Sequence, residues 1–273
     1  MQLPIYIVDA FADRPLAGNP AAVCPLETWL PVATMQAIAA EMNLSETVFF
    51  APDDDGAYGI RWFTPIREVE LIGHATLAAG YLVLTKLQPS APLVRFRNGG
   101  DEFVVARDGD ALTLEMPSLP PQEIAAPAGL IEALGAGSGR RPKAVLAAKH
   151  YLCVYERASD IVALAPDMQS LASMPLPAAI VTAPADRVAT GGITERFDFV
   201  SRFFAPANGV PEDAVSGVAH LCLAPYWSQR LGRKKLVGRQ LSARGGTVLC
   251  EDRGARVRLG GRAALFLEGR IVL

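Results

Sequence analysis

The sequence predicts an α+β fold made of two similar lobes, each a strand-rich sheet barrel around one central helix. Three observations support this prediction: a five-residue motif recurs about 140 positions later, each copy precedes a glycine and an apolar helical run, and 24 Gly and 21 Pro are spread along the 273 residues. Frequent Gly and Pro favour short strands joined by turns. A helix that is apolar all round needs covering on several sides, which a curved sheet provides.

Local patterns predict the first elements. Residues 3–11 are apolar and partly β-branched, which is typical of a strand, and the turn formers Gly18-Asn19-Pro20 follow them. In residues 28–43, apolar side chains recur at i, i+3, i+4 and i+7, which predicts an amphipathic helix. Residues 45–50 predict a second strand, and its alternation places Glu46 on one face with apolar neighbours.

The recurring motif defines the two lobes. Arg61-Trp62-Phe63-Thr64-Pro65 returns as Arg202-Phe203-Phe204-Ala205-Pro206. After each copy, we predict a central helix, from Gly73 to Leu87 and from Gly217 to Leu231.

The copies then continue in step. The pairs Gly99-Gly100 and Gly245-Gly246 each precede a strand with alternating apolar residues, and the two strands match. We interpret Gly99-Gly100, together with Gly191-Gly192, as hairpin turns. We place the two lobes at residues 1–120 and 127–263. The linker between them is expected within residues 117–127, where four prolines interrupt helix and strand patterns. A final strand near residues 264–273 can pair with the first lobe.

Composition excludes several classes of protein. The net charge is −2, and the densest basic cluster, at residues 230–235, is too short to track a nucleic acid backbone. No run of about 18 apolar residues predicts a membrane span, and no charged segment precedes the apolar start, so we expect a cytoplasmic protein without nucleic acid or membrane partners. Four cysteines far apart and three histidines without ligand spacing predict buried thiols and no metal site.

The expected site lies where the two central helices begin. If the lobes face each other, the amino ends at Gly73 and Gly217 point into one cleft and favour an anion such as a carboxylate. Glu46, His74 and Glu212-Asp213 surround these junctions. Carboxylates and an imidazole in a dry cleft are suited to proton transfer, whereas no motif for hydride or phosphate chemistry occurs.

Five segments together make the chain resemble the PhzF family of phenazine-biosynthesis isomerase-like proteins. They are Gly18-Asn19-Pro20, Leu44-Ser45-Glu46-Thr47, Phe63-Thr64-Pro65, Gly73-His74-Ala75-Thr76-Leu77 and residues 212–220, Glu-Asp-Ala-Val-Ser-Gly-Val-Ala-His. The resemblance implies the diaminopimelate-epimerase fold with two pseudo-symmetric lobes, and a homodimer. It also implies an isomerase or epimerase that transfers a proton without a cofactor on a small carboxylate-bearing substrate.

The resemblance also implies roles for residues. Glu46 is the expected general acid/base and His74 and Asp213 its helpers, while the expected substrate contacts are Asn19, Ser45, Gly73, Ser216, Gly217 and Val218. Related racemases use paired cysteines at the two helix starts, and no cysteine here matches those positions. At Val218 the family usually has a serine. The missing hydroxyl weakens anion binding there and suits a more apolar substrate.

Each of these residues also has a purely structural alternative. Glu46 can be a solvated acid on an edge strand, and His74 can be a structural histidine. Asn19 can belong to a simple turn, and Glu212 or Asp213 can be the N-cap of the following helix. We predict that His220 is buried structure and that His150 belongs to the surface or the core. At the level of function, the alternative is a ligand-binding or regulatory protein that keeps the fold without turnover. A hydrolase is a distant third reading, because Ser45 and Ser216 have no dedicated base in the sequence.

Overall fold

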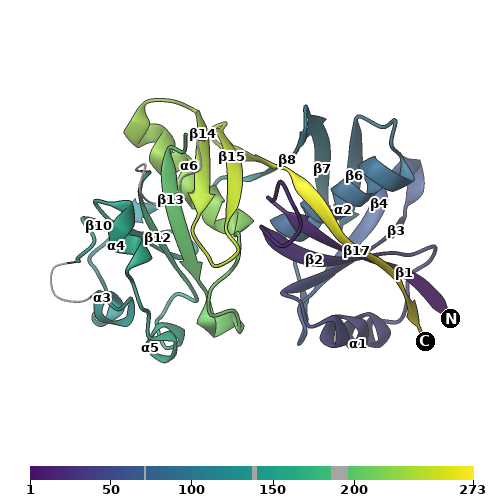
Figure 1. The fold of residues 1–273 in the computed structure, drawn as a ribbon, viewed down its shortest axis with the longest axis horizontal. Helices are drawn as coiled ribbons and strands as arrows, with labels where there is room; N and C mark the ends of the chain where they lie inside the picture. The colour runs from purple at the N-terminus through teal and green to yellow at the C-terminus, as the bar shows by residue number, and fades with distance from the viewer. Residues whose placement is uncertain (71, 137–139, 186–195) are drawn as a thin grey trace. The chain divides into compact units, whose positions relative to one another are not determined.

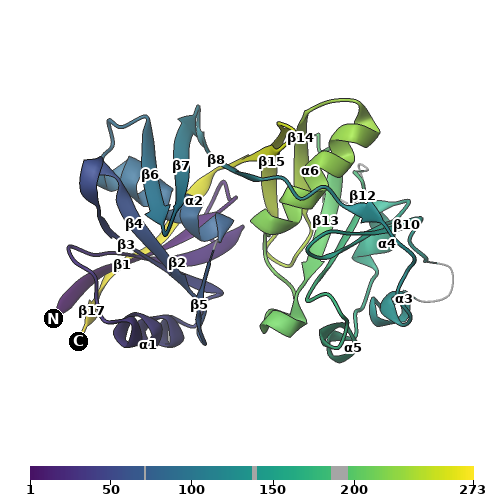
Figure 2. The same cartoon turned by 180° about the vertical axis from the view of Figure 1, so that it is seen from behind.

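The computed structural model describes residues 1–70, 72–136, 140–185 and 196–273. The chain divides into two compact units, Met1–Met116 with Leu259–Leu273, and Pro117–Arg258. The last strand, β17 (Ala263–Val272), pairs antiparallel with the first strand, β1 (Gln2–Ala10). The amino and carboxyl ends of the chain therefore lie side by side in the first unit (Figures 1 and 2).

The first unit is a curved sheet with one helix inside and one outside. Its other elements are β2 (Asn19–Pro25), α1 (Val32–Met42), β3 (Glu46–Pro52), β4 (Tyr58–Phe63), β5 (Glu68–Val69), α2 (Gly73–Leu82), β6 (Leu93–Asn98), β7 (Asp101–Asp108) and β8 (Ala111–Pro117). The predicted amphipathic helix is confirmed as α1, whose buried residues Met35, Ile38 and Ala39 pack in one apolar cluster with Phe49. Because β3 is covered on both faces, all of its residues except the last are buried.

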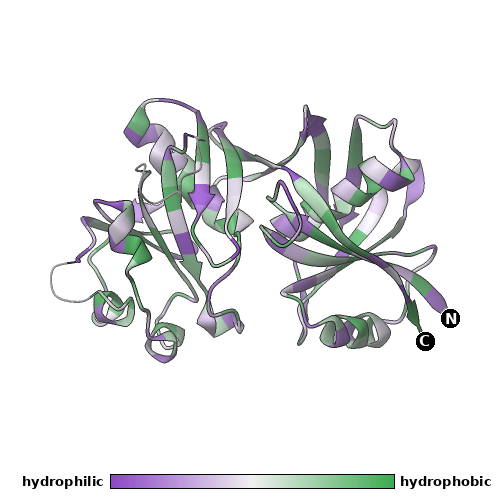
Figure 3. Ribbon diagram, viewed as in Figure 1, coloured by the Kyte–Doolittle hydropathy of each residue, from purple (hydrophilic) through white to green (hydrophobic). Residues whose placement is uncertain are grey.

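The second unit has the same kind of sheet and more short helices. Its elements are β9 (Gln122–Glu123), α3 (Leu130–Ala133), β10 (Ala144–Ala147), β11 (Tyr151–Val154), α4 (Ala158–Val162), α5 (Met168–Ala172), β12 (Ala179–Pro184), β13 (Phe199–Phe204), α6 (Gly217–Leu231), β14 (Lys235–Gln240) and β15 (Gly246–Asp252). The strand β16 (Arg256–Gly261) begins in this unit, and its last three residues belong to the first. In Figure 3 the short helices α3 and α5 carry hydrophobic and hydrophilic residues side by side. Their apolar residues Leu130 and Leu171 belong to one buried cluster with β11 and β12.

The two units share one strand topology. In the first unit, consecutive pairs along β1-β2-β3-β4-β6-β7 are antiparallel, parallel, antiparallel, parallel and antiparallel. The order β10-β11-β12-β13-β14-β15 repeats that series. The hairpin glycines match too, because Gly99 and Gly245 both adopt positive φ, 58° and 64°. The predicted α+β fold of two pseudo-symmetric lobes is thus confirmed, while Gly191-Gly192 lies outside the described residues.

The predicted central helices begin where the sequence places them. α2 starts at Gly73 and is buried along its length against β1, β2, β3, β7 and β17. At Gly80 it approaches β7 so closely that a Cβ would lie 2.5 Å from Val105 Cγ1. The predicted run to Leu87 ends differently: the α-helix stops at Leu82, and one π-helical turn follows, closed by the Gln88 N–H on the Val83 carbonyl at 2.6 Å.

α6 contains a proline in its interior, Pro225. Pro225 has no N–H, so the carbonyl of Leu221, four residues earlier, loses its helical partner. The N–H of Leu119 takes that place at 3.0 Å. The predicted linker is therefore hydrogen-bonded to the central helix of the second unit, and its β9 pairs with β10.

The four cysteines are buried, as predicted. Burial raises the pKa of Cys24, Cys153 and Cys222 to about 12, so these thiols are poor nucleophiles near neutral pH. No helix in the described parts of the chain is long and apolar enough to cross a membrane.

Candidate active site

A carboxylate and an imidazole meet in the first unit. Glu46 is the first residue of β3, and His74 is the second residue of α2. The Glu46 Oε2 atom lies 3.1 Å from His74 Nε2, and the two residues are only 9% and 4% exposed. The solvated reading of Glu46 is therefore wrong for this structure, because its carboxyl is buried against the start of the central helix.

The surroundings of Glu46 favour its charged form. Burial is the largest influence and by itself raises the pKa of this carboxyl, because a low-dielectric environment disfavours charge. The attraction and contact of His74 oppose it and, with a smaller effect of Ser45, hold the pKa of Glu46 below its usual range. The result is an ionised, nearly dry carboxylate, which is the state that a general base needs.

The adjacent helix end supplies hydrogen-bond donors. The N-cap residue of α2, Ile72, makes no side-chain capping hydrogen bond, and its carbonyl accepts the Thr76 N–H at 3.0 Å. The first-turn amides of a helix point away from its hydrogen-bond ladder, and the helix dipole adds positive potential there. Trp62 Nε1 donates to Thr76 Oγ1 at 3.0 Å, which ties this turn to β4. The helix start is suited to a carboxylate ligand.

Two further predicted residues lie at the same end of the sheet. Asn19 begins β2 and Glu46 begins β3, and these adjacent strands are parallel, with Ala21 opposite Glu46. Asn19 is 1% exposed, and Ser45 is half-buried directly before Glu46. The first unit therefore gathers the predicted residues Asn19, Ser45 and Glu46 at the level where Gly73 and His74 begin α2.

In the second unit, the loop that leads into α6 is firmly held. Gln240 donates from Nε2 to the Asp213 carbonyl at 2.7 Å and accepts the Ser216 N–H on Oε1 at 2.9 Å. Ser242 Oγ donates to the Ala214 carbonyl at 2.6 Å. Nothing in the sequence pattern pointed to Gln240, because its role depends on β14 lying beside the loop.

The N-cap of α6 decides against the structural alternative for Glu212 and Asp213. Neither Glu212 nor Asp213 caps the helix; Ser216 does, with its Oγ accepting the Ala219 N–H at 3.2 Å. The physical reason is position, since the two acids lie more than one residue before the first helical residue, Gly217.

Glu212 has a different partner. Arg202 donates to its two carboxylate oxygens at 2.8 and 3.0 Å, and also to the carbonyls of Ile161 and Leu164. Arg61, which occupies the matching position of the recurring motif, makes the same bidentate ion pair in the first unit: it donates to both carboxylate oxygens of Glu68 at 2.7 Å. Each arginine fixes the segment before a central helix. Glu212 is therefore part of the scaffold and not of the reacting set.

The N-cap makes a testable contribution to stability. We expect Ser216→Ala to lower the free energy of unfolding by about 1 kcal/mol, because the Ala219 N–H loses its acceptor. Ser216→Thr keeps an oxygen at that position and is the matched control. Urea unfolding of the three proteins measures the effect, and equal stability of Ser216→Ala and the original chain would contradict the capping role.

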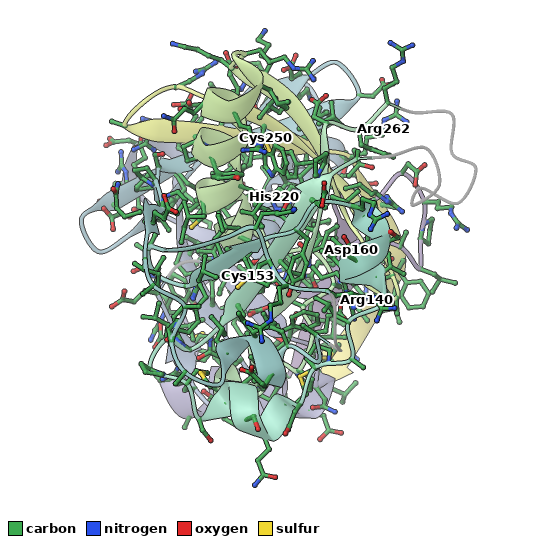
Figure 4. All side chains as sticks on the ribbon, turned by 90° about the vertical axis from the view of Figure 1, so that its left-hand side faces the viewer. Arg140, Cys153, Asp160, His220, Cys250 and Arg262 are labelled. Atoms are coloured by element: carbon green, nitrogen blue, oxygen red, sulfur yellow. The ribbon has the colours of Figure 1, made fainter. Side chains whose placement is uncertain are left out.

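The other two histidines are buried in the second unit. His220 Nδ1 lies 2.7 Å from the Ser216 carbonyl, and burial lowers its pKa to about 4, which confirms the prediction of a structural histidine. Figure 4 shows it among the side chains around α6. His150, which we predicted at the surface or in the core, is 4% exposed and packs its ring on Phe203 at 5.3 Å.

The comparisons with known proteins show the family and the fold of the chain. The family model of phenazine biosynthesis-like proteins, PhzC-PhzF, matches residues 8–269. The chain belongs to this family. An uncharacterized isomerase of Pseudomonas aeruginosa is 47% identical over 273 residues, covering 100% of both chains.

Solved structures extend the likeness. A PhzF-family protein of Enterococcus faecalis is 37% identical, has a TM-score of 0.92 and is matched over 100% of both chains. A hydroxyproline epimerase of Agrobacterium vitis shares the fold with a TM-score of 0.59 at 9% identity, over 100% of this chain and 93% of that one. The chain thus has the fold of the PhzF and epimerase structures.

Proposed function

We propose that this PhzF-family protein is an isomerase that moves a proton on a small carboxylate-bearing substrate without a cofactor. The observation that supports it best is the buried Glu46–His74 pair at the uncapped start of α2. In this proposal the first-turn amides of α2 hold the substrate carboxylate. The ionised Glu46 then has a carbon-bound hydrogen within reach.

The proposed chemistry is acid/base throughout. The Glu46 carboxylate takes a proton from a carbon beside an activating group, and the electron pair of the broken C–H bond moves into that group. The carboxylic acid so formed returns the proton to the substrate at its new position. His74 keeps Glu46 ionised between turnovers, and Asp213 is proposed to support the complementary transfer.

The contribution of the second unit stays a prediction. Asp213, Ser216, Gly217 and Val218 meet at the amino end of α6, in a segment that Gln240 holds in place. We propose that this segment contacts the same substrate. The homodimer, the cytoplasmic location and the absence of nucleic acid and membrane partners also stay predictions.

Exchange of carbon-bound hydrogen with solvent tests the proposed function. The chain is incubated in D₂O with a panel of small carboxylic acids that carry an acidic C–H, and mass spectrometry follows deuterium uptake. An isomerase incorporates deuterium into at least one acid. If calorimetry finds acids that bind and none of them gains deuterium, the alternative of a ligand-binding protein is supported instead.

Val218 provides a test of substrate character. Its side chain is half-buried and stands where the family usually has a serine. We expect Val218→Ser to strengthen binding of polar acids by about 0.5–1.5 kcal/mol, the net value of one hydrogen bond. Calorimetry measures the affinity and thermal unfolding the stability. A loss of stability above about 1 kcal/mol with unchanged affinities would show that Val218 is core packing.

A further inference from the structure

The shared topology allows a residue-by-residue comparison of the two units. Val48 is opposite Trp62 in the first unit, and Ile180 is opposite Phe203 in the second. Trp62 and Phe203 are matching members of the recurring motif, so Val48 corresponds to Ile180. Positions on both faces of the two sheets can therefore be matched.

The face of the sheet towards α2 has one such difference. Glu46, two residues before Val48, corresponds to Ala178. His74 is the second residue of α2, and its counterpart, the second residue of α6, is Val218. Matching positions thus keep their place in the fold while their chemistry differs, and the other face of the sheet has a second difference of this kind.

Arg61 lies on the face away from α2. Phe63, two residues after it, packs in the apolar cluster with α1, whereas Trp62 between them donates to the α2 residue Thr76. Side chains alternate between the two faces along a strand, so Arg61 is on the side of α1. Glu46 contacts the start of α2 and is therefore on the opposite face.

The matching arginine of the second unit uses all three of its nitrogens. Arg202 donates from Nε and Nη2 to the two carboxylate oxygens of Glu212, at 2.8 and 3.0 Å. Its Nη1 donates to the carbonyls of Ile161 and Leu164 at 3.0 and 3.1 Å. These carbonyls come from the end of α4, in the connection between β11 and β12. The second unit thus places uncharged carbonyl oxygens against an arginine that a glutamate already neutralises.

Arg61 keeps the ion pair and lacks the carbonyls. Its Nε and Nη2 donate to both oxygens of Glu68 at 2.7 Å, and its Nη1 makes no hydrogen bond with the described residues. A pocket of about 350 Å³ lies here, and both Arg61 and Glu68 line it. That volume is within the range of sites for small molecules.

A glycine and a tryptophan shape the pocket. Two residues before each arginine, the second unit has Val200, which is buried against its short helices, and the first unit has Gly59, which lines the pocket. Trp29, from the connection between β2 and β3, also lines it, and a Cβ on Gly59 would lie only 2.9 Å from Trp29 Cζ2. The Arg61 guanidinium is 5.7 Å from the centre of the Trp29 ring.

The charges around the pocket balance. Its lining includes the cations Arg61 and Arg97 and the anions Asp53 and Glu68. An anionic ligand would meet two carboxylates as well as two guanidinium groups, so the lining attracts neither sign of charge strongly. A neutral carbonyl requires only an N–H donor, which Arg61 Nη1 provides.

We propose that this pocket binds a small, uncharged, flat heteroaromatic molecule that carries a carbonyl group, such as a carboxamide or a lactam. The carbonyl accepts a hydrogen bond from Arg61 Nη1, as two backbone carbonyls do from Arg202, and the ring stacks on Trp29. The inference goes beyond the proposed isomerase activity, because the pocket and Glu46 are on opposite faces of the sheet.

The indole N–H signals of the three tryptophans provide the test. Trp29 is 42% exposed, whereas Trp62 and Trp227 are 0% and 1% exposed. We would titrate the ¹⁵N-labelled protein with nicotinamide and assign the Trp29 signal by its absence in Trp29→Leu. We expect saturable shifts at the Trp29 indole and at the Arg61 Nε–H. Acetamide, which lacks the ring, and 3-pyridylmethanol, which lacks the carbonyl, are expected to bind more weakly.

The variants measure the two contacts separately. Arg61→Lys keeps a charge for Glu68, but an ammonium cannot span the carboxylate and the ligand as the guanidinium fork does. We expect the dissociation constant of nicotinamide to rise about 5- to 10-fold, the effect of one hydrogen bond, and by a similar factor in Trp29→Leu, which loses the stacking. Arg14→Lys, at an exposed arginine that does not line the pocket, is the matched control and should bind as the original chain does. The titration of the unchanged protein stands even where a variant does not fold.

Four results would overturn the proposal. They are no shift at Trp29 with nicotinamide, equal affinity for acetamide or 3-pyridylmethanol, a dissociation constant that Arg61→Lys leaves unchanged, and tighter binding of nicotinate, whose carboxylate would mark an anion site. None of these results concerns deuterium exchange at Glu46. The proposed isomerase activity can therefore stand when this pocket fails to bind, and the reverse also holds.

Discussion

Glu46→Gln is expected to reduce deuterium incorporation into an exchanging substrate by about 10²- to 10⁴-fold, the usual contribution of a positioned acid/base group. The substitution keeps the size and the polar character of the side chain but cannot accept a proton from carbon. Since Glu46 is 9% exposed and contacts His74 at 3.1 Å, no bulk water replaces it easily as the base. Mass spectrometry of the acid after timed incubation measures the change.

A matched control separates chemistry from folding. Glu41 lies on α1 in an exposed position, and Glu41→Gln removes the same charge elsewhere in the first unit. We expect that variant to exchange at the original rate. Circular dichroism and thermal unfolding should show both variants folded, because the loss of the buried Glu46 charge removes its desolvation cost together with its attraction to His74. Undiminished exchange in Glu46→Gln would assign the base to another residue.

Much of the fold follows from local sequence patterns. The glycines at 73 and 217 begin helices because each precedes a long apolar run, and Gly99 and Gly245 make turns because positive φ suits glycine. The alternation that put Glu46 on the face of Val48 also holds, since Glu46 contacts the central helix. Such features need only neighbours along the chain, so periodicity and turn chemistry suffice to predict them.

Other features depend on contacts between distant segments. A helix N-cap was the structural alternative for Glu212 and Asp213, because an acid before a helix is a common N-cap. Ser216 caps α6 instead, and Arg202 engages Glu212 across ten residues. Gln240 reaches the Asp213 segment only because β14 pairs beside β13. The correspondence of Glu46 with Ala178 requires the register of two sheets, which no motif reveals.

The comparison of the units gives a physical reason for the different roles of their central helices. In the first unit, the cost of burying the Glu46 carboxylate is offset by His74, and both residues are needed for that balance. In the second unit Ala178 and Val218 carry no charge, and Ser216 caps the helix. The ionisable pair of Glu46 on β3 and His74 on α2 therefore belongs to the first unit, and this restricts the proposed base to that unit.

The second large effect is expected from His74→Leu, read as a pH profile. In the unchanged protein Glu46 has a lowered pKa, so the carboxylate persists as the pH falls to the ordinary glutamate value of about 4.3. The rate of exchange at limiting substrate should therefore drop only below about pH 4.3. In His74→Leu the attraction disappears while burial remains, and burial outweighs the effect of Ser45.

The pKa of Glu46 should then rise above its ordinary value. The fall of the exchange rate on acidification, which is the acidic limb of the pH profile, should therefore begin at a higher pH, and the exchange rate should be lower at each pH below neutral. The direction of this pKa shift is set by desolvation, which is the largest effect on Glu46 and raises its pKa, because His74, the main effect that lowers the pKa, is absent from the variant. Carbon-13 NMR of the glutamate carboxyls, with Glu46 assigned through Glu46→Gln, gives the same pKa where exchange is too slow to follow. A limb that stays in place or moves to lower pH would mean that His74 does not hold Glu46 in its ionised form.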